Sequence, residues 1–287
     1  MSDLVIREFQ SKPNPSAREF VERSTVRGLM AISRDWIFIL TVAGLSIFLD
    51  HWLAWLVAVL FIGVMQFSLA EAILHEAAHY NLFRSRRMHH WLQFLYAWPF
   101  LQTLGDYRAE HLNHHQHLMT DRDQTWIDYR LYGLNAKHPN VFYIWFIKPF
   151  TLFPTWFFLR HGNALLNRAT WLPLGIFWGS VGVVFLVLGQ IHLLLLYWFT
   201  PLLLVYPIVN YWSEIEEHYN ALSGSRSNLN RIVNFLTHNE GYHSVHHNHP
   251  SIPFYNLPKA HRALKSDGGD VSFGFFDTYR QISIRRG

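Results

Sequence analysis

The chain has 287 residues, of which 50% are hydrophobic, 17% aromatic and only 15% charged. A typical soluble domain carries about 25% charged residues, and here the apolar residues form blocks long enough to cross a bilayer. The formal net charge of +4 comes without a basic tract of the kind that binds nucleic acid, and the absence of cysteine excludes disulfides, iron–sulfur ligation and thiolate metal sites. Any bound metal must therefore be held by nitrogen and oxygen.

The N-terminal segment, residues 1–35, is polar and basic, and we interpret it as a cytosolic segment near the membrane. We expect no secretory signal, because no basic start is followed by a short apolar core and a cleavage site. Within the segment, the stretch from Ala17 to Ala31 is compatible with a surface helix.

Two apolar runs follow, Trp36 to Leu49 and Trp52 to Ala70, separated only by the polar pair Asp50 and His51. A membrane-spanning helix needs about 20 residues, so the first helix must begin before Trp36. We predict a transmembrane hairpin with spans at approximately 34–49 and 52–72.

A second pair of apolar runs, Trp171 to Leu188 and Ile191 to Trp212, is joined by Gly189 and Gln190. We predict a second hairpin, with spans at approximately 171–188 and 191–212. Pro201 and Pro207 are expected to bend the last span, because proline removes a helical hydrogen bond.

Two other apolar stretches, Trp91 to Leu104 and Val141 to Leu159, are interpreted as interfacial helices, since the first is short and both contain proline. All 24 Lys and Arg support four spans: six precede the first hairpin, ten lie between the hairpins, eight follow the second, and neither turn has any. The positive-inside rule then places both termini in the cytosol. We predict a single all-α membrane domain over 1–287, with a cytosolic cap formed by 73–170 and 213–287, in a bacterial inner membrane or its equivalent.

Histidines are concentrated in three short motifs that we call boxes. Residues three and four apart share one face of a helix, so the imidazoles of each box can converge on a common point. Neutral imidazole is the commonest metal ligand in proteins. The boxes, at HxxxH and twice at HxxHH spacing, are His75 and His79, then His111, His114 and His115, then His243, His246 and His247.

Eight box histidines are too many for one ion, whereas two ions with four or five ligands each would use them all. His218 is a ninth candidate ligand, because it projects from the end of a predicted span as the first box does. Glu214, one helical turn before it, is expected to contact a metal through water or to support a ligand. Asp121 and Asp123, after the second box, are expected to orient ligand imidazoles.

The boxes and their flanks resemble those of the integral-membrane fatty acid desaturase and hydroxylase superfamily, over roughly residues 36–262. The first box and Asp121-x-Asp123 after the second resemble acyl-lipid desaturases, as does the stretch from Ile252 to Leu257. Glu240-Gly-Tyr-His243 resembles the approach to the third box in acyl-CoA desaturases. In those enzymes an Asn-x-x-x-His also serves the metals; here Glu214 replaces the asparagine and His218 matches the histidine.

This resemblance implies two non-haem iron ions, O2 as co-substrate, and insertion of a double bond into an unactivated alkyl segment, with a fatty acyl chain as the first expectation. No haem-binding His-Pro-Gly-Gly segment or flavin fingerprint is present in the sequence, so electrons are expected from an external ferredoxin or cytochrome b5-type donor on the cytosolic face. An acyl-lipid, an acyl-CoA or another alkyl-bearing molecule is the expected substrate, and membrane lipid the expected surroundings.

Three alternatives stay open at this point. The same scaffold serves hydroxylases and ketolases, and the substrate could be a small amino-acid-like metabolite with a short alkyl segment. A different class is a metal-binding membrane transporter or sensor. Against transport, the candidate ligands lie outside the apolar runs, whereas transport sites lie near the bilayer midplane.

Overall fold

The computed structural model describes residues 16–161, 168–264 and 269–284 of the chain. Residues 1–15 of the predicted N-terminal segment lie outside the described residues, as do 162–167, 265–268 and 285–287 of the predicted cap. In chain order, the α-helices are α1 (Thr25–Leu49), α2 (Trp52–Phe67), α3 (Leu74–Ala78), α4 (Arg86–Trp91), α5 (Leu104–His117), α6 (Gln124–Tyr132), α7 (Phe153–His161), α8 (Arg168–Val187), α9 (Ile191–Leu194), α10 (Thr200–Leu204), α11 (Tyr206–His218), α12 (Arg231–Leu236), α13 (His243–Asn248), α14 (Leu257–Ala263) and α15 (Phe275–Ser283).

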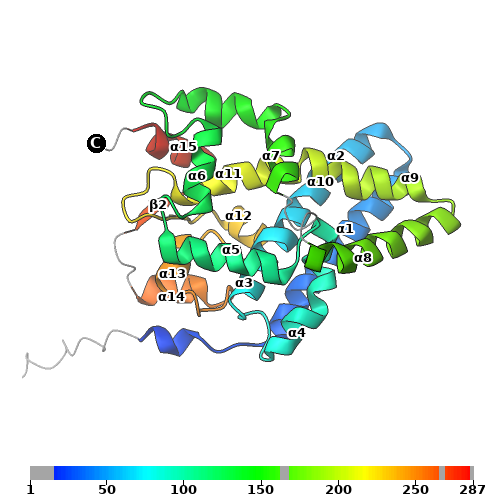
Figure 1. Cartoon of the computed structure of the whole chain (residues 1–287), viewed down its shortest axis with the longest axis horizontal. Coiled ribbons are helices and arrows are strands. Elements are labelled where there is room, and N and C mark those ends of the chain that lie inside the picture. The colour runs from blue at the N-terminus through cyan, green and yellow to red at the C-terminus, as the bar shows by residue number, and fades with distance from the viewer. Residues whose placement is uncertain (1–15, 162–167, 265–268, 285–287) are drawn as a thin grey trace, which may run out of the picture.

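Four helices are long and apolar enough to cross a membrane: Thr25–Leu49, Trp52–Ala78, Thr170–Val187 and Ile191–His218. The second is continuous from α2 through the π-helical turn η2 (Ser68–Ile73) into α3, and the fourth runs from α9 through the π-helical turn η8 (Leu195–Phe199), α10 and α11. These helices confirm the predicted number of apolar segments. Figure 1 shows α1, α2, α8 and α9 together at one end of the molecule and α6, α13, α14 and α15 toward the other.

The first helix begins earlier than predicted. Ser24 caps it, because its side chain accepts a hydrogen bond from the Arg27 backbone N–H, and the helix then runs without a break to Asp50. Asp50 ends it in the left-handed conformation, at φ 42°. The stretch from Ala17 to Ala31 does not form one surface helix: it contains a short 3₁₀ turn, η1 (Ala17–Phe20), then four residues outside any helix, and then the start of α1.

Large apolar side chains of these helices face outward, as Phe48 of α1 does with 85% of its surface exposed and Val187 of α8 with 79%. Helices with this much exposed apolar surface are suited to lipid rather than water. Inside, α1 packs along α2, and Trp36 of α1 stacks on Trp198 of η8 with the ring centroids 5.3 Å apart. One apolar core therefore joins the two pairs of long helices.

The last long helix is interrupted between its two prolines. Val205 separates α10 from α11, and Pro201 and Pro207 each stand near the start of one of these helices. At this break the helix approaches α2 very closely, because a β-carbon added to Gly63 would lie 2.4 Å from that of Val205. A glycine is required at this crossing.

The two shorter apolar stretches do not form long helices. The first contains the 3₁₀ turns η3 (Leu92–Leu95) and η4 (Trp98–Phe100), and the second contains the π turn η5 (Tyr143–Ile147), the 3₁₀ turn η6 (Lys148–Phe150) and most of α7. Pro99 and Pro149 each stand near the start of one of the 3₁₀ turns. Neither stretch is long enough as one helix to cross a bilayer.

The described residues are mostly helical, as predicted, and two short strands are the exception. β1 (Arg226–Asn228) pairs in parallel with β2 (Asp270–Ser272), with Ser227 opposite Val271. Buried Arg226 strengthens this connection, since its guanidinium donates to the Glu216 and Tyr219 carbonyls and to the Gln281 side chain. The C-terminal residues are thereby fastened to the end of α11, close to the third box.

Candidate metal centre

Four helices bring the predicted ligands together. His75 lies in α3 and His79 directly after it, the second box lies in the last two turns of α5, the third box opens α13, and His218 is the last residue of α11. Helical spacing puts the members of each box on one face, as the sequence predicts. The structure describes all nine histidines, and we divide them into two adjacent groups.

The first, which we call the five-histidine group, combines all three boxes. Its ligand atoms lie within 4.8 Å of one another. Nε2 of His75 lies 2.8 Å from Nε2 of His246, Nε2 of His79 lies 2.8 Å from Nε2 of His111, and His115 lies 3.0 Å from His246. The five members are His75, His79, His111, His115 and His246.

The second, which we call the four-histidine group, consists of His114, His218, His243 and His247. Nε2 of His218 lies 3.1 Å from Nε2 of His114 and 2.9 Å from Nε2 of His243. The His247 ring lies 4.8 Å from that of His218. The two groups touch, because the rings of His115 and His247 stack at 4.2 Å between centroids.

Burial keeps the imidazoles of His115 and of the third box neutral. It lowers the pKa of His115 to about 3 and holds the pKa values of His243, His246 and His247 well below the usual 6.5, with the neighbouring imidazoles acting in the same direction. Neutral imidazole offers a lone pair to a metal, and the crowded Nε2 atoms cannot all be satisfied by hydrogen bonds to one another. Nδ1 of His246 and Nε2 of His247 have no hydrogen-bond partner in the part of the chain that is described. This all-nitrogen donor set fits two borderline transition-metal ions such as iron.

Two histidines of the four-histidine group are oriented by hydrogen bonds at Nδ1, the ring nitrogen that does not face the other histidines. Nδ1 of His114 lies 2.9 Å from Oδ1 of Asp123, a fully buried carboxylate that also accepts from the Met119 and Thr125 backbone N–H groups. Nδ1 of His218 donates to the Gly224 carbonyl at 2.8 Å. Each bond leaves Nε2 as the free acceptor nitrogen. Asp121 lies exposed in the turn before α6, and neither histidine group includes it.

Two further carboxylates, which the sequence interpretation did not single out, also lie close to the histidines. Oε2 of Glu217 lies 3.6 Å from Nε2 of His243, and Oε1 of Glu240 lies 3.6 Å from Nδ1 of His75. Glu217 directly precedes His218, and Glu240 lies three residues before the third box. This closeness in the sequence could have identified both as candidates. Glu214 lies outside both histidine groups, and its Oε2 accepts from Thr125 Oγ1 at 3.4 Å.

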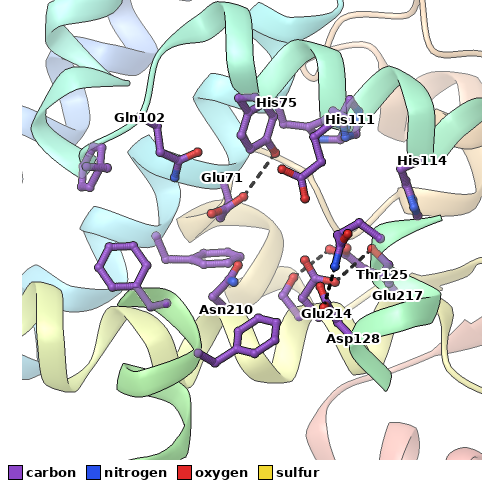
Figure 2. Close-up of a pocket in the computed structure, with 18 of the residues that line it drawn as sticks. Glu71, His75, Gln102, His111, His114, Thr125, Asp128, Asn210, Glu214 and Glu217 are labelled. Atoms are coloured by element: carbon purple, nitrogen blue, oxygen red, sulfur yellow. Dashed lines mark hydrogen bonds between the residues drawn. The ribbon is translucent and has the colours of Figure 1, made fainter. Parts of the chain in front are cut away.

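A cavity of about 190 Å³ opens beside the histidines. Figure 2 shows Glu71 and His75 on one side of it and Glu214, Asp128 and Thr125 gathered on another. His75, His111, His114, His218 and His243 also form part of its wall. A molecule in this cavity would therefore reach both histidine groups.

The family model described as fatty acid desaturase matches residues 50–279, a range that contains all nine histidines and the cavity. The chain belongs to the fatty acid desaturase family. The resemblance of the boxes to this superfamily is thereby confirmed.

Curated relatives in this family are desaturases of several kinds. The chain is 26% identical to a dihydrorhizobitoxine desaturase of Bradyrhizobium elkanii, over 91% of this chain and 82% of that protein. It is 24% identical to an sn-1 acyl-lipid omega-3 desaturase (ferredoxin) of Synechocystis, over 90% of this chain and 80% of that protein. It is 29% identical to the human sphingolipid delta(4)-desaturase/C4-monooxygenase, over 68% of this chain and 61% of that protein.

Proposed function

We propose that the protein is a membrane desaturase that uses two iron ions and O2 to convert a CH2–CH2 unit of an alkyl segment into a double bond. The observation that carries the proposal is the pair of touching histidine groups beside a cavity, in a chain of the fatty acid desaturase family. In the overall reaction O2 accepts four electrons and becomes two water molecules. Two electrons leave with the two C–H bonds, and two electrons and two protons come from outside the substrate.

In this proposal each histidine group holds one iron through its Nε2 or Nδ1 atoms, and Glu217 and Glu240 offset part of the metal charge. The ions, when bound, supply the O2-dependent redox chemistry that no side chain can supply. The protein fixes the ligands, as Asp123 does for His114, and buries them away from water. It also positions the alkyl segment against them, with Phe67, Phe100 and Phe157 in the cavity wall.

We also propose the topology: two transmembrane hairpins, α1 with α2 and α8 with the α9–α11 helix, and a cap on the cytosolic side that holds the histidines. The positive-inside rule supports it, because the Lys and Arg residues lie outside both hairpin turns. Electrons would enter from an external donor on that side. The Synechocystis relative is named as a ferredoxin desaturase, which makes a ferredoxin the first donor to test.

A hydroxylase on the same scaffold is the second candidate. The human relative is named as both a desaturase and a C4-monooxygenase, so one chain of this family carries both descriptions. For both candidates an acyl-lipid, an acyl-CoA or another alkyl-bearing molecule is the proposed substrate. The placement of the alkyl segment against the metals decides between the two products.

The test is mass analysis of lipids and small metabolites from cells that express the protein with a ferredoxin, with and without O2, comparing wild type, His246→Ala and His249→Ala. His249 lies in the same stretch but in neither histidine group, which makes it the matched control. We expect an O2-dependent product two mass units lighter than its precursor in wild type and His249→Ala, and none in His246→Ala. A product sixteen units heavier would establish the hydroxylase, and full activity in His246→Ala would overturn the proposed centre.

A further inference from the structure

A completely buried carboxylate stands in the first apolar helix, outside both histidine groups. Asp35 of α1 is 0% exposed, although α1 is one of the four helices long and apolar enough to cross a membrane. An acidic side chain in such a helix is costly, and it is usually paired and serves a function. Because neither histidine group includes Asp35, its function has to be sought in its contacts.

One oxygen of Asp35 joins two segments that are far apart in the sequence. Oδ2 accepts a hydrogen bond from the Ser68 hydroxyl at 2.7 Å and lies 2.9 Å from Nε2 of His238. Ser68 is the first residue of the π-helical turn η2, and His238 belongs to the turn between α12 and α13. The first of these segments leads into the first histidine box, and the second leads into the third box.

Arg34 strengthens the same connection. Its Nε donates to Oδ1 of Asp35 at 2.7 Å, and its two Nη atoms donate to the Phe235 and Leu236 carbonyls at 2.6 and 2.9 Å. Those carbonyls end α12, where backbone acceptors have no partner within the helix. Nη2 also lies 2.9 Å from Nε2 of His238, so that ring is bonded to the Arg34–Asp35 pair in either tautomer. We call these four side chains the α1 junction: Arg34, Asp35, Ser68 and His238.

The turn that the α1 junction holds has a backbone that needs support. His238 and Asn239 follow one another at φ 51° and 66°, in the left-handed region that is disfavoured for residues with a β-carbon. Such a conformation persists where the surrounding structure fixes it. Asn239 is fixed through its backbone N–H, which donates to the Asn234 carbonyl at 2.8 Å, and His238 is fixed through its side chain. Because α13 begins at His243, this turn sets the direction of the third box.

The α1 junction also lies close to the metal centre. His238 lines a small cavity together with His75 and His246. Nε2 of His75 lies 2.8 Å from Nε2 of His246, so the first and third boxes meet at these two rings. The chain after the third box is held separately, because Glu76 Oε2 accepts from the Phe254 backbone N–H at 3.1 Å. The chain before the third box is held by the α1 junction.

We infer that Asp35 is a positioning residue that aligns the first histidine box with the third, through Ser68 on one side and His238 on the other. The inference rests on the proposed function, because it concerns the alignment of the proposed metal ligands. The five-histidine group takes ligands from both of these boxes, whereas the four-histidine group takes none from the first box. Loosening the α1 junction should therefore weaken the ion of the five-histidine group.

The test compares two serine-to-alanine substitutions. Both serines are buried and both link α1 to another helix, since Ser68 bonds to Asp35 and Ser46 bonds to the Tyr197 hydroxyl at 2.9 Å. Iron per chain is measured on purified protein dialysed against increasing chelator, and Tm is measured on the same protein without metal. Removing a direct partner of a ligand costs about 10- to 100-fold in metal affinity, so Ser68→Ala, one contact further away, should cost about three- to tenfold at one ion.

Ser46→Ala should lower the Tm of the metal-free protein as Ser68→Ala does but release iron as wild type does. The same loss of iron in both variants, or wild-type retention in Ser68→Ala, would overturn the inference. Combining Ser68→Ala with Glu217→Gln should release both ions, because Glu217 lies beside His243 of the other group.

A second pair of variants separates the hydrogen bond from packing. His238→Gln keeps an N–H donor for Asp35, whereas His238→Leu removes it. We expect His238→Gln to retain iron as wild type does and His238→Leu to lose one ion at lower chelator concentration. If His238→Leu does not fold, the serine pair decides. Equal retention in two folded His238 variants would contradict the positioning role.

The iron content of wild type separates this inference from the proposed function. If wild type retains iron and Ser68→Ala retains it equally, the positioning role is wrong and the desaturase proposal stands. If wild type retains no iron, the proposed function is wrong, and the positioning role is wrong with it.

Discussion

Nδ1 of His114 and Oδ1 of Asp123 lie 2.9 Å apart, and the aspartate is completely buried. Asp123 also caps α6, because it accepts a hydrogen bond from the Thr125 backbone N–H. One carboxylate therefore fixes both an imidazole of the four-histidine group and the start of the next helix. The orientation of His114 depends on the fold of the turn that follows it.

Asp123→Asn should lower the affinity of the four-histidine group for iron, and O2-dependent turnover, about 10- to 100-fold, because the amide is a weaker acceptor for the His114 N–H. Asp121→Asn changes an exposed carboxylate in the same turn and should leave both unchanged. Elemental analysis and a turnover assay on the two purified variants measure this. Equal losses in both variants would show that the turn, and not the contact with His114, is responsible.

Glu217→Gln should reduce retained iron from about two ions per chain toward one. The substitution keeps the size of the side chain but removes a charge 3.6 Å from Nε2 of His243. The five-histidine group has no contact with Glu217 in the described residues and should keep its ion. Iron per chain, measured after dialysis against a weak chelator, is the readout, with Glu216→Gln as the control. Unchanged stoichiometry in Glu217→Gln would remove this carboxylate from the site.

Gly28→Ala should lower the thermal stability of the protein, by about 1–3 kcal/mol as for other overpacked sites. Its new β-carbon would lie 2.1 Å from the Leu82 carbonyl oxygen, so α1 and the loop after the first box would have to separate. Gly44→Ala tests the same exchange in the same helix, where a β-carbon meets nothing within 4 Å. That variant should be as stable as wild type or up to about 1 kcal/mol more stable, because alanine favours helix. Melting of both variants in detergent compares them directly.

His89 should make the protein less stable in acid. Burial lowers its pKa from 6.5 to about 4, and the neutral ring accepts from the Phe83 backbone N–H and donates to the Ser85 carbonyl. Between pH 6.5 and 4 the unfolded chain binds a proton at this ring that the folded chain does not, so this contribution to stability falls as pH falls.

His89→Gln removes that proton and should flatten part of the fall in Tm between pH 7 and pH 5. The difference between wild type and variant isolates His89 from the other buried histidines, which both proteins share. The Tm advantage of wild type should therefore shrink on acidification. Parallel profiles of Tm against pH would contradict the assignment.

The sequence was sufficient for the apolar helices and the boxes because both depend on local spacing. A run of apolar residues and a set of imidazoles three and four apart have the same meaning wherever the chain goes. His218 could be proposed because it follows a span. The family resemblance then assigned both patterns to one membrane desaturase, and the family match over residues 50–279 agrees with this assignment.

What the sequence did not reveal depends on contacts between distant segments. The pairing of β1 with β2 joins residues 44 apart, Arg226 with Asp270, over only three positions, and no periodic pattern marks so short a strand. Glu217 was passed over for Glu214 because helical spacing alone favoured the residue four before His218. Glu217 is close to His243 because α13 brings that histidine alongside it. This contact between distant segments depends on the fold and cannot be inferred from helical spacing.

Both long helices that deliver a histidine to the centre contain a π-helical turn, Ser68–Ile73 before His75 and Leu195–Phe199 before His218. A π-helical turn holds one residue more than the hydrogen-bond pattern of an α-helix, so it rotates everything beyond it by the angle of one residue, about 100°. Losing a single residue from either turn would restore a regular α-helix and swing the histidine away from its partners. The number of residues between each apolar helix and its histidine therefore sets the direction in which the proposed metal ligand points.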